Sequence, residues 1–160
     1  MFGLFKKKNS KSEVEAPKVV PLKPIDYPSL VILAWAKAVE GNPDLQKWLL
    51  DEGYNELYLS VYAIYLKDEA RDWLVENGYA HVMAMIHAAE GNKKARKWLI
   101  DNRFETLYHI ALAVDHEAES WDWLTKNASR DLLILAQSIQ RVKDQIEENH
   151  NDPHSFKRDF

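Results

Sequence analysis

Histidine and carboxylate side chains are the groups in this chain with the potential for chemistry, because the 160 residues include six histidines and no cysteine. His109 and His116 lie on either side of an expected helix end, with Asp115 and Glu117 beside them, and these are the residue types of a weak divalent cation site. His81 and His87 are about 120° apart around a helix, so they do not form a ligand pair. Ordinary surface histidines are the simpler interpretation, and we expect no metal site.

The other polar clusters also lack the pattern of a catalytic centre. His150, Asp152 and His154 fall in a polar tail, where no rigid element holds them in position. The basic run at residues 93–97 is more typical of a solvated helix face than of an anion site. There is no glycine-rich phosphate loop, His-Glu-x-x-His pair or nucleophile elbow. The sequence therefore predicts a protein that is not an enzyme and uses no cofactor.

The charge of the chain is divided unevenly between a basic tail and an acidic body. Residues 1–26 contain six lysines and three acidic residues, and the remainder contains 15 basic and 22 acidic residues. An acidic body argues against nucleic-acid binding, which needs clustered lysine and arginine. No apolar run approaches the roughly 20 residues that cross a bilayer. With no cysteine, these features favour a cytoplasmic location.

A repeat of 25 residues supplies the elements that must position these side chains. Three of its columns are nearly invariant within the chain: Trp48, Trp73, Trp98 and Trp123; Leu49, Leu74, Leu99 and Leu124; and Ala38, Ala63, Ala88, Ala113 and Ser138. Each repeat has two apolar stretches with helical spacing, separated in the first repeat by Gly41, Asn42 and Pro43. Each repeat is therefore expected to be a helical hairpin. The tryptophan column shares a face with Leu45 and Leu49, which predicts that it packs in the core.

The resulting prediction is an all-α fold, an α-solenoid of four 25-residue helical hairpins with a C-terminal capping helix. Such short helices are marginal alone and need stacking between repeats, so we expect an elongated array. The capping helix should begin near Ser129 and cover its open edge. The helical-repeat domain is expected at residues 27–149, between a flexible basic tail at 1–26 and a flexible C-terminal tail at 150–160.

One segment resembles a known repeat class. Residues 88–92, Ala-Ala-Glu-Gly-Asn, followed by residues 97–102, Lys-Trp-Leu-Ile-Asp-Asn, resemble the helical part of an ankyrin repeat, and the likeness recurs over about residues 27–128. The period is 25 rather than about 33, and the Thr-Pro-Leu-His tetrapeptide is missing. The resemblance is thus one of class, and it implies a scaffold that binds partners.

The leading functional hypothesis is a non-enzymatic protein–protein interaction module or scaffold that binds a protein or peptide. One column varies in identity between repeats and faces away from the expected core, and several aromatic or histidine residues interrupt otherwise polar columns. Half-buried packing explains any one of these residues equally well. The candidate partner-binding residues are Lys37, Tyr62, Tyr65, His87, Leu112, His116 and Trp121.

Two alternatives remain open. In the first, the protein is a peripheral membrane adaptor, with Phe2, Leu4 and Phe5 inserted in the bilayer and Lys6, Lys7 and Lys8 attracted to anionic lipid at about 1 kcal/mol each. In the second, it is a self-associating structural protein, which requires an exposed apolar patch on the first or last repeat. The sequence leaves the partner's identity and the oligomeric state undetermined.

Overall fold

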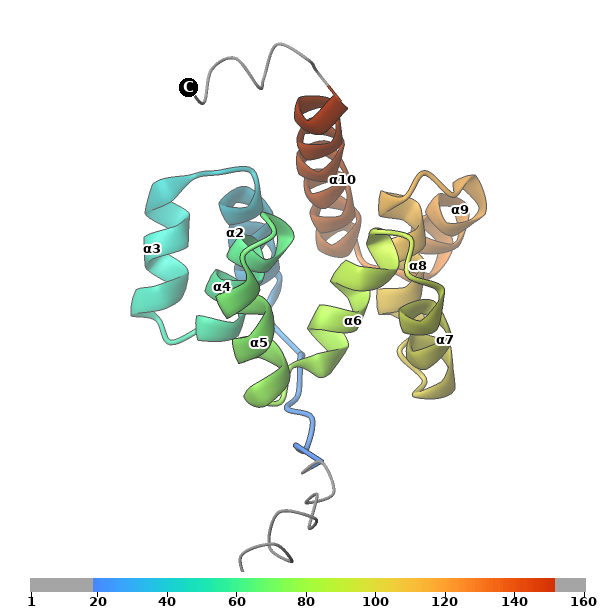
Figure 1. The fold of residues 1–160 in the computed structure, drawn as a ribbon. Helices are drawn as coiled ribbons and strands as arrows, with labels where there is room; N and C mark the ends of the chain where they lie inside the picture. Colours follow the sequence, from blue (N-terminus) through green and yellow to red (C-terminus); the bar gives the residue numbers. More distant parts are fainter. Residues whose placement is uncertain (1–18, 152–160) are drawn as a thin grey trace, which may run out of the picture.

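The computed structural model describes residues 19–151, and this part of the chain is entirely helical apart from its turns and an extended N-terminal stretch (Figure 1). The expected all-α class is confirmed. The helices follow the 25-residue period and are, in order, α2 (Ser29–Val39), α3 (Pro43–Asp51), α4 (Asn55–Ile64), α5 (Asp68–Glu76), α6 (Ala80–Ala89), α7 (Lys93–Asp101), α8 (Glu105–Val114), α9 (Ala118–Asn127) and α10 (Arg130–Asn151).

The helices form two layers. The inner helices, α2, α4, α6, α8 and α10, each pack against the next, and the outer helices, α3, α5, α7 and α9, each pack on the inner helices that precede and follow them in the chain. Two buried columns make this arrangement possible. Ala38, Ala63, Ala88, Ala113 and Ser138 are fully buried and allow inner helices to approach closely, and Leu49, Leu74, Leu99 and Leu124 fill the space between the layers.

The position of α10 differs from the expectation. We expected it to cap the open end of an elongated array, but it packs against both α8 and α2, so the inner helices close into a ring (Figure 1). Ser138 Oγ donates a hydrogen bond of 2.8 Å to Glu40 Oε1, and Arg141 lies 3.0 Å from the same oxygen. Ring closure follows from curvature that accumulates over the repeats until the last helix meets the first.

The tryptophan column was wrongly expected to be core. Trp48 is 37% exposed, and Trp73, Trp98 and Trp123 are only partly buried. In three repeats the indole ring instead stacks on the aromatic residue of the following turn, with centroid distances of 6.0 Å for Trp48 and Tyr54, 6.2 Å for Trp73 and Tyr79 and 5.8 Å for Trp98 and Phe104. The leucine beside each tryptophan faces the core. These three tryptophans therefore stabilise turns at the edge of the core.

Local turn chemistry agrees with the sequence in alternate repeats. The side chains of Asn42 and Asn92 cap α3 and α7 by accepting hydrogen bonds from backbone N–H groups three residues later. The residue before each asparagine is glycine with a positive φ. In the other two repeats Leu66 and His116 occupy the glycine position with φ of 67° and 69°, a conformation that costs free energy in non-glycine residues.

Residues 19–26 fall within the range expected to be a flexible tail, but they extend along the N-terminal ends of the inner helices. Lys23 N–H donates to Gly78 O at 2.9 Å, and His81 Nε2 lies 2.8 Å from Lys23 O. Gly78 has a φ of +93°, and a Cβ atom there would meet Pro21 O at 2.7 Å. This close contact requires glycine at position 78. The ends of both expected tails, residues 1–18 and 152–160, lie outside the described residues.

Candidate binding pocket

A cavity of about 200 Å³ opens at the C-terminal ends of the inner helices and is called the central pocket here. It is formed by α4, α6, α8 and the second half of α10, with most of its surface apolar. Its lining comprises Ile64, Leu66, Met85, Ile86, Ala89, Glu90, Ile110, Ala111, Val114, Ile139, Lys143, Ile146, Glu147 and His150. The pocket exists because α10 closes the ring, which brings its apolar face opposite the ends of α4 and α6.

The repeat explains why the pocket lies in the middle of the ring. Four of its lining residues, Ile64, Ala89, Val114 and Ile139, are each 25 residues apart and come from four successive inner helices. Equivalent positions of a ring all face its axis, so these side chains converge. The smallest of them is alanine, and Ala111 on α8 is also small. These two positions leave space that larger side chains would fill.

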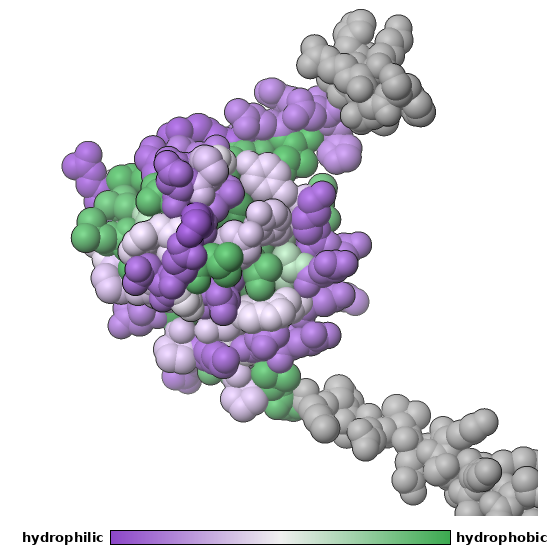
Figure 2. Space-filling view, turned by 90° about the vertical axis from the view of Figure 1, so that its left-hand side faces the viewer, coloured by the Kyte–Doolittle hydropathy of each residue, from purple (hydrophilic) through white to green (hydrophobic). Residues whose placement is uncertain are grey.

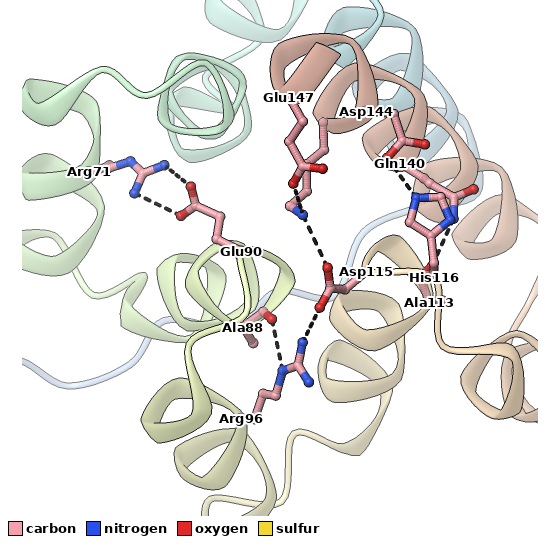
Figure 3. Close-up of polar contacts among 11 residues, drawn as sticks. Arg71, Ala88, Glu90, Arg96, Ala113, Asp115, His116, Gln140, Asp144 and Glu147 are labelled. Atoms are coloured by element: carbon pink, nitrogen blue, oxygen red, sulfur yellow. Dashed lines mark hydrogen bonds and ion pairs between the residues drawn. The ribbon is translucent and has the colours of Figure 1, made fainter. Parts of the chain in front are cut away.

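Polar contacts at the helix ends form the rim of the pocket, and two of them recur with the repeat (Figure 3). Arg71 donates from Nε to Ala63 O at 3.0 Å and makes two hydrogen bonds to Glu90, of 3.0 and 2.9 Å. Arg96, which is 25 residues later, donates to Ala88 O and pairs with Asp115 at 2.6 Å. Each arginine thus satisfies a carbonyl at an inner helix end and links two repeats.

The last helix completes this rim with other residue types. Gln140 Nε2 donates to Ala113 O at 3.0 Å, in place of an arginine. Lys143, whose side chain is only 12% exposed, lies 3.4 Å from Asp115 and 2.8 Å from Glu147. His116 Nε2 lies 2.8 Å from Asp144 (Figure 3). These contacts fasten α10 to α8 and bring its charged groups to the mouth of the pocket.

In the first repeat, Glu40 is the carboxylate that accepts hydrogen bonds from a neighbouring helix, as Glu90 and Asp115 do in later repeats. Burial alone would raise the pKa of its carboxyl group, but hydrogen bonds from Ser138 and Lys37 and the charges of Lys37 and Arg141 lower that pKa below its usual value. Glu40 therefore stays ionised and accepts bonds from α10. Glu40, Glu90 and Asp115 share one column of the repeat, so the carboxylates that link neighbouring repeats also link the last helix to the first.

The mouth of the pocket is acidic on the side of α10. Glu147, with a side chain that is 58% exposed, lines both the pocket and an adjoining shallow hollow. Asp144, Glu148 and Asn151 complete that hollow. Arg71 and Arg96 are each bound to a carboxylate, and Lys143 to two. These three cations face five carboxylates, those of Glu90, Asp115, Asp144, Glu147 and Glu148, so the mouth carries a negative net charge beside an apolar cavity.

None of the seven predicted partner-binding residues lines the central pocket. Tyr62 lines a surface groove with Trp73, and its hydroxyl lies 3.1 Å from that of Tyr58; His87 lines a separate groove with Trp98. Lys37 pairs with the nearby Glu40. Leu112 is half-buried. The structure divides these residues between different grooves and packing contacts.

The other three predicted residues, Tyr65, His116 and Trp121, each contact another part of the protein. Tyr65 donates from its hydroxyl to Val39 O at 3.1 Å. His116 contacts Asp144 and Gln140 on α10 and therefore lies near the rim of the pocket. Trp121 is partly buried against the core.

The histidines considered as weak metal ligands lie apart from one another. His109 stacks on Trp123 with a centroid distance of 4.1 Å and lies 3.0 Å from Ser120 Oγ, whereas His116 turns to α10. His81 is buried between Tyr79 and Phe104. Within residues 19–151 no group of three or more histidine and carboxylate side chains is placed to hold a metal ion.

The structure describes the residues that bear on self-association but not those proposed to contact a membrane. Phe2, Leu4, Phe5, Lys6, Lys7 and Lys8, the candidate membrane residues, lie outside the described residues. In residues 19–151 every helix is too short or too polar to cross a bilayer. The first repeat exposes Leu30, Trp48 and Leu50, and Figure 2, which views the side that carries α3, shows apolar residues there between polar ones. These exposed residues are the type of feature that self-association requires.

Comparison of the chain with protein-family models, curated proteins and solved structures found no match. The likeness to ankyrin repeats therefore stays a prediction of class. The pocket was missed at the sequence level, although one signal was present: the apolar column Val39, Ile64, Ala89, Val114 and Ile139 contains a single small residue. Without ring closure, that alanine has no special meaning.

Proposed function

We propose that the protein is a non-enzymatic interaction module, built from four helical hairpins of the solenoid type and closed by α10, which binds a protein or peptide partner at the central pocket. The observation that supports this is an apolar cavity framed by fixed polar contacts. A cavity of about 150 Å³ holds a benzene ring. The central pocket, of about 200 Å³, therefore accepts one bulky apolar side chain.

The charged residues at the rim of the pocket are more typical of a binding site than of a catalytic site. Its charged groups pair with one another, as Arg71 does with Glu90 and Lys143 with Glu147. Paired groups hold the helix ends in place, so the mouth is pre-organised and little ordering is required when a partner binds. A buried apolar anchor inside a polar rim is the usual distribution of binding energy in protein interfaces.

Selection of displayed peptides on the whole chain tests this proposal. Ile146→Asp places a charge in the pocket wall, and Gln145→Asp adds the same charge at an exposed neighbouring position outside the lining. Selected peptides should share an apolar residue, and their affinity should fall about tenfold with Ile146→Asp but little with Gln145→Asp. Thermal melting of both variants establishes that they fold.

A parallel variant addresses the predicted surface column. If Tyr62→Ala, His87→Ala and Leu112→Ala together abolish peptide binding while Ile146→Asp does not, the central pocket is not the binding site. The site would then lie on the outer grooves. Equal affinity for all variants would argue against both surfaces.

A further inference from the structure

The chemistry of the central pocket and the charge of its mouth point to one occupant within this chain's own sequence. Resting on the proposed function, we infer that the pocket binds the apolar-basic segment (residues 2–8) of a second copy of the chain. One apolar side chain of that segment, Phe5 being the one next to the lysines, fills the cavity. The following lysines lie against the carboxylates of α10.

The pocket requires two properties of its occupant. Its lining is apolar around Ala89, Ala111 and Val114, so the occupant must present a bulky apolar group. Its α10 side presents Glu147 in the wall, paired with Lys143, and Asp144 and Glu148 immediately beyond. Carboxylates therefore outnumber cations on this side, and a neighbouring positive charge is favoured. A ligand with an apolar anchor directly beside basic residues satisfies both.

The apolar-basic segment has these two properties at the required spacing. Its sequence, Phe-Gly-Leu-Phe-Lys-Lys-Lys, places three bulky apolar residues before three consecutive lysines. Adjacent residues in an extended chain are about 3.3–3.6 Å apart. A lysine one or two residues beyond the anchor is thus within reach of Glu147, which lines the cavity itself. Residues 1–26 are basic and the remainder of the chain is acidic, which also favours contact between the segment and the pocket.

The position of the described N-terminal residues favours a second copy over the same molecule. Lys23 is hydrogen-bonded to Gly78 and His81 at the N-terminal ends of the inner helices, whereas the pocket opens at their C-terminal ends (Figure 1). α10 alone has 22 residues, or about 33 Å at 1.5 Å per residue. Residues 9–18 reach at most about 40 Å when fully extended. Covering the length of α10 alone would therefore need almost full extension of these residues, which is entropically costly, so a second copy is favoured.

Binding in this way joins two different surfaces, the N-terminal end of one molecule and the C-terminal end of the next. Two copies can make this contact reciprocally, which closes a two-fold dimer, or each can bind the next copy in one direction, which continues beyond a dimer unless a ring forms. The first repeat's exposed Leu30, Trp48 and Leu50 are then not required for association. This separates the inference from a contact made through the outer surface.

A labelled peptide of residues 1–10 provides the direct test. Its binding is measured by fluorescence anisotropy to the whole chain carrying Phe2→Ser, Leu4→Ser and Phe5→Ser, so that no segment of the protein competes. We expect saturable binding that weakens about tenfold with Ile146→Asp in that background and is unchanged with Gln145→Asp. A peptide with its three lysines replaced by glutamine should bind more weakly and lose most of its salt dependence.

Sedimentation velocity of the unmodified chain gives the second readout. Concentration-dependent association that disappears in the triple-serine protein supports the inference. A monomer at every concentration overturns it, as does peptide binding that Ile146→Asp leaves unchanged. If the chain is monomeric but displayed peptides still require Ile146, the proposed function stands and only the second-copy occupant is wrong.

Vesicles of phosphatidylserine and phosphatidylcholine separate this inference from the membrane alternative. Co-sedimentation that depends on Phe2, Leu4 and Phe5 but is unaffected by Ile146→Asp, together with no peptide binding to the pocket, assigns the segment to lipid and overturns the inference. Absence of vesicle binding, with peptide binding retained, supports it.

Discussion

The two ends of the inner helices are closed in different ways. At the N-terminal end the chain fills its own ring: Tyr27 contacts Trp35 and Tyr54 edge-on, and its hydroxyl donates to the buried Glu56 at 2.8 Å. At the C-terminal end, polar contacts hold the helices around a cavity. The two ends differ because residues 21–27 cover the N-terminal end, whereas no described segment covers the C-terminal end.

The largest effect should come from removing the residue that fills the N-terminal end. Tyr27→Ala deletes a ring that packs against two aromatic residues and leaves Glu56 without its hydrogen bond, so we expect the free energy of unfolding to fall by about 3 kcal/mol. Tyr27→Phe keeps the ring and should cost about 1 kcal/mol. Urea unfolding measures both. If Tyr27→Ala lowers the free energy of unfolding by less than Tyr27→Phe does, the N-terminal end is not tightly packed.

Substitutions of two adjacent alanines on α6 test whether the central pocket, at the C-terminal ends of the inner helices, is empty. Ala88→Val enters the fully buried alanine column between helices and should destabilise by about 1–3 kcal/mol. Ala89→Val enlarges a residue that lines the pocket, at a position where two other repeats have valine, and should stabilise by about 0.5–1 kcal/mol while weakening peptide binding. Equal destabilisation by both variants would mean that the pocket is already filled.

The N-terminal end should also be sensitive to acid. Burial lowers the pKa of His81, with partial compensation by its hydrogen bonds to backbone, and burial also lowers the pKa of His109. The unfolded chain therefore binds more protons than the folded chain once the pH falls below about 6.5, so stability declines from there toward the folded-state pKa. His81→Gln should flatten the dependence of unfolding free energy on pH between about 7.5 and 5.5. His109→Gln serves as the comparison. If His81→Gln leaves the pH dependence of the unfolding free energy unchanged, His81 is not the source of the acid sensitivity.

Breaking one link of the rim should have the smallest effect. Arg71→Met removes the bonds to Ala63 O and Glu90, and because both side chains are partly exposed we expect a loss of about 1 kcal/mol or less. The loss should shrink at high salt, where the ion pair is screened. Lys47→Met, which removes only the exposed pair with Asp51, is the control and should change stability little. A loss comparable to that of Tyr27→Ala would make the rim as important as the packed end.

Much of the local structure was predictable, because it depends on neighbours in sequence. The glycine and asparagine at positions 41–42 and 91–92 indicated helix ends that the structure has. Leu49 was correctly placed on the core face, and the whole leucine column is fully buried. The tryptophan column was not correctly placed, because helical spacing alone cannot decide between the centre of a core and its edge. Trp98 lies beside the buried Leu99, yet its ring turns to Phe104.

The sequence by itself determined the period, the type of each element and the residues that cap or break the helices, since these follow from contacts within a few residues. Only the tertiary structure decided that α10 meets α2, that residues 21–27 close one end and that a pocket remains at the other. The physical reason is that curvature is the sum of small rotations between repeats. Each rotation is set by side-chain packing across the layers, and no single repeat contains the total.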